Sequence, residues 1–175
     1  MMEWPARAGI TCDHGGFARC RDMEHLRHAA PMHVDLASLA TALEASWDHR
    51  TAYGAVSQPG NPAVGQCYPT SRVVQFFYPQ TEIACGEVWT GAGTECHFWN
   101  VSGSGDAAEW IDLTWQQFPP RSRVRHFRLL DRHRLGDSPP TVERCALLLR
   151  RVLSRLAEPG EGRSSSAPAP LLSAP

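Results

Sequence analysis

Three side chains of this 175-residue chain stand in local contexts that favour nucleophilic chemistry, and Cys67 comes first. It follows Gly65-Gln66, where a loop meets a predicted helix. The unpaired N–H groups and the dipole of a helix N-terminus favour negative charge, which predicts a lowered thiol pKa and a nucleophilic cysteine. A small buried residue is the alternative interpretation of a cysteine at a helix start.

His97 and Asp112 lie in two separate strand-like segments further along the chain. On neighbouring antiparallel strands two such side chains come side by side. Asp112 would then hold the imidazole tautomer, and His97 would take the proton from the Cys67 thiol, as in a Cys-His-Asp triad. Taken singly, His97 is also compatible with a hydrogen-bonded strand histidine, and Asp112 with a residue that caps a turn.

The residues around Cys67 offer donors for an oxyanion. The Gln66 side-chain amide is one candidate, although it could equally bond the loop backbone. The backbone N–H groups of Cys67 and Tyr68 are the others.

A basic segment follows the strand-like region, and its arginines and the tryptophans of the strands are candidates for contact with a substrate. Strand alternation would place Arg121, Arg123 and Arg125 on one face, either as a solvated surface or as a clamp for an anionic substrate. Most of the four tryptophans among the strands should be core, while one or two line a cleft; Trp99 is our candidate for substrate contact.

The elements that must position these residues can be predicted from periodicity and turn chemistry. Asp35 is a plausible N-cap for a first helix, and Asp137 or Ser138 for a last helix whose apolar stripe runs from Val142 to Leu156. Between them we expect a loop at 51–66, a helix at Cys67–Phe77, strands at 82–90, 94–101 and 109–114, and a further strand within 121–134 with core candidates Val124, Phe127, Leu129 and Leu130.

Composition divides the chain into a folded domain at 34–157, a loosely ordered extension at 1–33 and a disordered Pro/Ser/Ala-rich tail at 158–175. The cysteines and histidines between residues 12 and 28 match no zinc spacing, so we expect no metal and no cofactor. No apolar run is long enough for a membrane span and no signal peptide is recognisable, which predicts a cytoplasmic protein without a membrane partner.

Charge excludes several further classes. The chain carries 17 basic and 18 acidic residues, so a nucleic-acid partner is not expected. All the basic residues are arginines, and the absence of lysine excludes Schiff-base and Walker-type lysine chemistry.

Gly65-Gln66-Cys67, His97-Phe98-Trp99-Asn100 and Asp112-Leu113-Thr114-x-x-Gln117-Phe118 occur in the order typical of the bacterial YunG-like family, which this chain resembles over roughly residues 36–155. The order is also similar to the core of transglutaminase-like and papain-like proteins. That resemblance implies an α+β fold, with an antiparallel sheet packed against a nucleophile-bearing helix and terminal helices. It also implies Cys67 as nucleophile, His97 as base and Asp112 as orienter.

The predicted activity is therefore cysteine-dependent acyl transfer, or hydrolysis of an amide or thioester, through an acyl-enzyme. The substrate would be a small molecule or a peptide, and an anionic one if the arginines form a clamp. The alternative is a non-catalytic binding module on the same fold, which uses its Trp and Arg surface to dock a partner.

Overall fold

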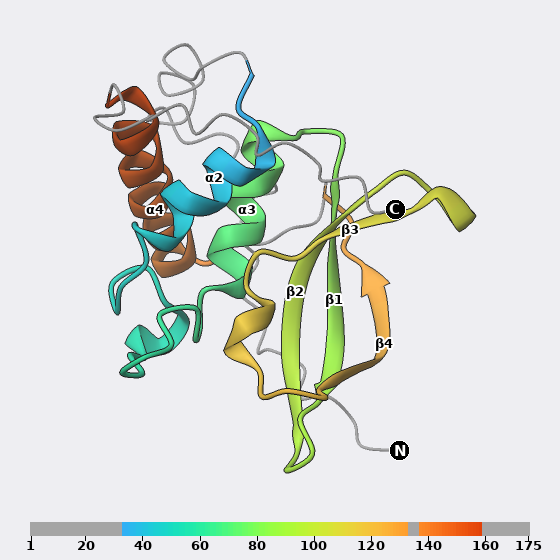
Figure 1. Cartoon of the computed structure of the whole chain (residues 1–175). Coiled ribbons are helices and arrows are strands. Elements are labelled where there is room, and N and C mark those ends of the chain that lie inside the picture. The colour runs from blue at the N-terminus through green and yellow to red at the C-terminus, as the bar shows by residue number, and fades with distance from the viewer. Residues whose placement is uncertain (1–32, 133–136, 159–175) are drawn as a thin grey trace, which may run out of the picture.

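The computed structural model describes residues 33–132 and 137–158 (Figure 1). The predicted extension and tail lie outside the described residues, except for His33 and Glu158. The cysteines and histidines between residues 12 and 28 also lie outside them.

One four-stranded antiparallel sheet, in the order β3-β2-β1-β4, forms half of the fold. Its strands are β1 (Glu82–Trp89), β2 (Thr94–Ser102), β3 (Glu109–Ile111) and β4 (Arg123–Leu129). The three consecutive strands β1, β2 and β3 form the predicted meander, and β4 pairs with β1. Because β3 is shorter than predicted, Asp112 lies directly after it rather than within it.

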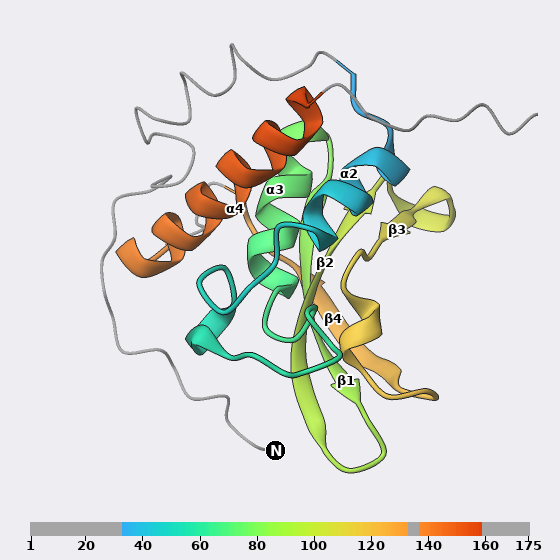
Figure 2. The same cartoon turned by 60° about the vertical axis from the view of Figure 1, so that its left-hand side comes forward.

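Three α-helices in the described part of the chain gather on one side of the sheet, with α3 between α4 and the strands (Figures 1 and 2). They are α2 (Leu36–Glu44), α3 (Cys67–Phe77) and α4 (Pro139–Ala157). Asp35 caps α2 by accepting the Ser38 N–H, as predicted. Ser138 is the N-cap of α4, and the two prolines that follow occupy the first turn, where their missing N–H groups cost no hydrogen bond.

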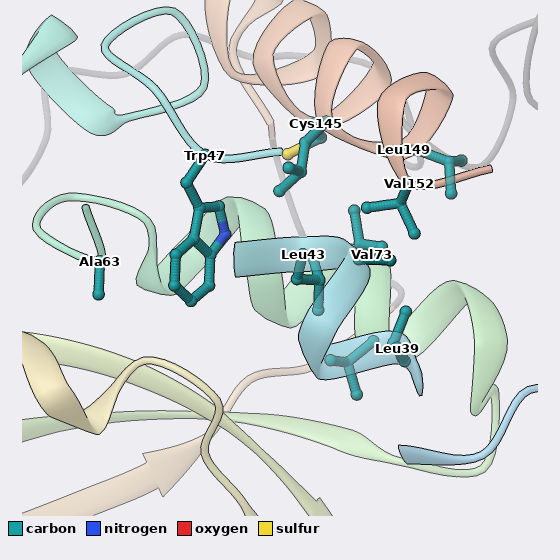
Figure 3. Packing of buried hydrophobic residues seen from close by; sticks show 11 residues of the cluster. Leu39, Leu43, Trp47, Ala63, Val73, Cys145, Leu149 and Val152 are labelled. Atoms are coloured by element: carbon teal, nitrogen blue, oxygen red, sulfur yellow. The ribbon is translucent and has the colours of Figure 1, made fainter. Parts of the chain in front are cut away.

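The main core fills the space between the three helices (Figure 3). The predicted apolar faces supply it, because Leu39 and Leu43 of α2 and Cys145, Leu149 and Val152 of α4 are fully buried. Val73 of α3 lies among these side chains. Helix α3 is thus packed on two sides, which fixes the position of its first residue, Cys67, relative to the sheet.

The face of the sheet that points away from α3 carries a smaller cluster around Trp99. The prediction that Phe127 and Leu129 belong to the core is wrong: their side chains are 43% and 49% exposed. The two residues lie on β4, an edge strand, and the described helices cover only the opposite face of the sheet. Trp110, on the opposite edge strand β3, is 50% exposed as well.

Within the described residues, no helix combines the length and the apolar character needed to span a bilayer.

Candidate functional site

The turn that delivers the chain to Cys67 depends on Gly65. Its φ of 75° lies in the left-handed region, and a Cβ there would stand 2.6 Å from Cγ2 of Val56. The Gly65 carbonyl accepts the Tyr53 N–H, which ties the loop back on itself. The loop therefore ends in a fixed direction at the first residue of α3.

Gln66 is buried next to the candidate nucleophile, and its side-chain amide donates to the Asp48 carbonyl at 2.9 Å. Asp48 is in turn held by Arg151 of α4 through its carboxylate, and this bond lowers the pKa of Asp48. Of the two alternatives for Gln66, the structure shows the bond to the loop backbone. The amide thus connects the entry to α3 with α4.

Backbone N–H groups surround the Cys67 sulfur, namely those of Phe98 and Tyr68 and its own. Burial nevertheless raises the thiol pKa to about 11, and the charge on Asp112 adds to the rise. The prediction of a lowered pKa is therefore wrong for this conformation, since the loss of solvation outweighs the N–H groups of the helix start. Cys67 is 9% exposed, and its thiol is neutral near pH 7.

His97, in the middle of β2, is fully buried and hydrogen-bonded at both ring nitrogens. Its Nε2 lies 2.6 Å from Oδ2 of Asp112, and the side-chain amide of Gln117 donates to its Nδ1 at 3.0 Å. The Asp112 carboxylate can only accept from the ring, so the proton lies on Nε2 and Nδ1 keeps its lone pair. This is the tautomer that a base of the predicted kind requires.

Aromatic rings fix the orientation of the imidazole. Trp99 is stacked on it with ring centroids 5.6 Å apart, while Phe118 and Trp115 approach it edge-on at 4.8 and 5.9 Å. Asp112 is held as firmly, because its Oδ1 accepts the backbone N–H of Thr114 at 3.0 Å. His97 is thus held in one orientation and shielded from water, whereas the side chain of Asp112 is 17% exposed.

The structure brings His97 and Asp112 into direct contact and places Cys67 beside the same strand. The backbone N–H of Phe98, the residue that follows His97, is near enough to the sulfur to lower the pKa of Cys67. The hydrogen bonds of the His97 ring, however, go to Asp112 and Gln117 and not to this sulfur. The His97 ring, stacked on Trp99, lies on the face of β2 that points away from α3, while the buried Cys67 thiol lies at the start of α3 near the backbone of Phe98.

The side chain of Tyr68 bonds residues outside the Cys67, His97 and Asp112 site, and it anchors α3. Its hydroxyl donates to Asp137 at 2.5 Å, and its ring meets Phe98 edge-on at 4.9 Å. Arg72 of the same helix forms a buried ion pair with Asp137 at 2.8 Å. Burial, together with the charge on Asp137, raises the pKa of Tyr68 far above its usual value. Only the backbone N–H of Tyr68 is directed at Cys67.

The three arginines of the basic segment are exposed. Arg121 precedes β4 with a φ of 73°, so the prediction that strand alternation orders all three is wrong for this residue. Arg123 begins the strand, and Arg125 lies where the register with β1 shifts, with its guanidinium 5.3 Å from the centre of the Trp89 ring.

Trp99 lines an open pocket on the face of the sheet opposite α3. The pocket has a volume of about 230 Å³, and its walls are Trp99, Trp110, Asp112, Trp115 and Val124. The prediction that most of the four tryptophans of the strand region are core is therefore wrong, because three of them line a cleft and only Trp99 is buried. Asp112 contributes to both sites, since its side chain bonds His97 and also reaches the pocket wall.

Gln117 is the residue of this site whose contact the sequence did not predict. Its place in Asp112-Leu113-Thr114-x-x-Gln117-Phe118 is a signal, because a buried-strand histidine needs partners at both nitrogens. In the described ranges, no group of three or more His, Cys, Asp or Glu side chains is arranged to hold a metal ion.

The fold and the site together define an α+β protein in which a helix-initial cysteine lies beside a buried His-Asp pair. The chain belongs to the YunG family: the family described as "YunG protein" matches residues 35–157. Neither the curated proteins nor the solved structures contain a significant match.

Proposed function

We propose that this protein is a cysteine acyltransferase or amidohydrolase of the transglutaminase-like or papain-like kind, with Cys67 as nucleophile, His97 as base and Asp112 as orienter. The observation that carries the proposal is the 2.6 Å bond between His97 and Asp112, formed beside a thiol at the start of a helix. Because the proton of the imidazole lies on Nε2, only Nδ1 can act as a base, and Gln117 now donates to this nitrogen.

The reaction begins from a neutral thiol, because burial holds the Cys67 pKa near 11. When the carbonyl of an amide or thioester reaches the sulfur, Gln117 leaves Nδ1, the thiol and the imidazole come within hydrogen-bond distance, and His97 takes the thiol proton at Nδ1. The sulfur–carbon bond forms, and the carbonyl electron pair moves to the oxygen. The intermediate then collapses to an acyl-Cys67, and the leaving amine or thiol takes the proton from His97.

The backbone N–H groups around the sulfur supply stabilisation for the oxyanion. The N–H groups of Cys67 and Tyr68 belong to the first turn of α3 and have no partner within the helix. Water or an external amine then attacks the acyl-enzyme, and His97 removes the proton of the attacking group. The sulfur–carbon bond breaks, the acid or amide product leaves, and His97 returns the proton to the Cys67 sulfur. An amine must come from outside, because the chain contains no lysine.

The proposal is tested by thiol release from a panel of acyl-thioesters of N-acetylcysteamine. We expect turnover by the wild-type chain, and a loss of about 100-fold or more in Cys67→Ala and His97→Gln. Cys96→Ser is the matched control, because Cys96 is half-buried and precedes His97 in the strand but points to the other face. Equal rates for the wild type and Cys67→Ala over the whole panel would contradict the proposal.

A further inference from the structure

The residues that line the pocket beside Asp112 favour a positively charged ligand. Three of its five wall residues are tryptophans, the fourth is Val124 and the fifth is Asp112. Asp112 is thus the one charged side chain among them. The faces of indole rings carry negative potential, so the rings and the carboxylate attract a positive group together.

The rings form a preorganised wall. Trp99 is 1% exposed and packs against Trp110 with ring centroids 5.0 Å apart, and Phe127 supports both rings at 5.3 and 5.1 Å. Gly86 leaves the space for this packing, because a Cβ there would lie 2.7 Å from the Trp99 ring. The half-exposed Trp110 forms the outer rim.

The hydrogen bonds of Asp112 favour one kind of cation. Its Oδ2 is engaged by His97, and its Oδ1 accepts both the N–H and the hydroxyl of Thr114 at 3.0 and 3.3 Å. The carboxylate therefore offers its charge more readily than further hydrogen bonds. A ligand rich in hydroxyl groups would find few acceptors on these walls, whereas an alkylated ammonium group needs none.

We infer that this pocket binds a small quaternary or substituted ammonium compound, held by the rings of Trp110 and Trp115, with the buried Trp99 ring behind them, and by the charge on Asp112. The volume of about 230 Å³ is below that of pockets for drug-sized ligands and fits a compact head group. The inference is independent of whether Cys67 reacts, because Cys67 is not among the residues that line the pocket.

The test uses choline and its neutral carbon isostere, 3,3-dimethylbutan-1-ol, on the full ¹⁵N-labelled chain. The indole N–H signals of the tryptophans report binding, with sodium chloride added to keep the ionic strength constant. We expect saturable shifts with choline, and binding of the isostere weaker by about tenfold or more. Equal binding of the two compounds, or no shift with choline, would overturn the inference.

Two variants locate the site. Trp110→Ala removes a half-exposed ring and should weaken choline binding about tenfold, whereas Leu129→Ala, an equally exposed apolar residue outside the pocket wall, should leave it unchanged. Equal losses in the two variants would overturn the inference. Cys67→Ser should bind choline as the wild type does, so failure of the acyl-transfer proposal and failure of this inference are distinguishable.

Discussion

The pH dependence of Cys67 alkylation should show whether the thiol pKa is raised by burial or lowered as in an activated cysteine. Burial raises the thiol pKa from 9.0 to about 11, which is a shift of about two units. Each unit is a factor of ten in the protonation equilibrium, so below pH 9 the folded protein holds about 100-fold less thiolate at this position than the unfolded chain. Iodoacetamide should therefore modify Cys67 at least about 100-fold more slowly in the folded state.

Peptide-resolved mass spectrometry follows the modification of Cys67 separately from that of the other cysteines. The rate should rise about tenfold per pH unit from 8 to 10 in the folded protein, and the urea-unfolded chain provides the control with an ordinary thiol. A plateau below pH 9 in the folded protein would refute the reasoning, because it would show a thiol that ionises at or below its usual pKa. The same raised pKa stabilises the fold fully below about pH 9, and this contribution is lost as the pH rises through 11.

Two further predictions concern the support of the site, and both are measured by urea unfolding. Asp137→Ala removes the partner of a buried guanidinium on Arg72, and we expect a loss of about 3–5 kcal/mol in the free energy of unfolding; a loss below 1 kcal/mol would contradict a buried pair. Gly86→Ala forces a methyl group against the Trp99 ring and should cost about 1–3 kcal/mol. Gly93→Ala, whose Cβ would meet nothing within 4 Å, should change stability by no more than about 0.5 kcal/mol, and equal effects of the two glycine variants would contradict the packing argument.

Local patterns predicted the helix that carries Cys67. Pro69 can only stand in a first turn, and Tyr78-Pro79 stops the helix, so the bounds Cys67–Phe77 follow from the backbone chemistry of prolines. Turn residues predicted the bounds of β1 and β2 to within one residue, whereas β3 ends three residues earlier than predicted. These features depend on neighbours in the sequence, which is why they were predictable.

Features that depend on which face of the sheet the helices cover could not be predicted from the sequence. Phe127 and Leu129 alternate as a buried strand would, but no sequence pattern tells which face of an edge strand the helices cover. The shift of the Cys67 pKa is opposite to the predicted one for a related reason, because desolvation reflects the burial of the thiol by the whole fold rather than its neighbours in the sequence. The contact of Gln117 with His97 spans 20 positions, beyond the reach of periodicity.

The central claim is that Cys67 forms a covalent acyl intermediate with the help of His97. Intact-mass spectrometry after rapid mixing with an acyl-thioester tests it most directly, followed by peptide mapping of the added mass. The account predicts one acyl group, located on Cys67, sensitive to hydroxylamine, and formed about 100-fold more slowly in His97→Gln. An unmodified Cys67 in a protein that turns the thioester over, or acylation as fast in His97→Gln as in the wild type, would contradict it.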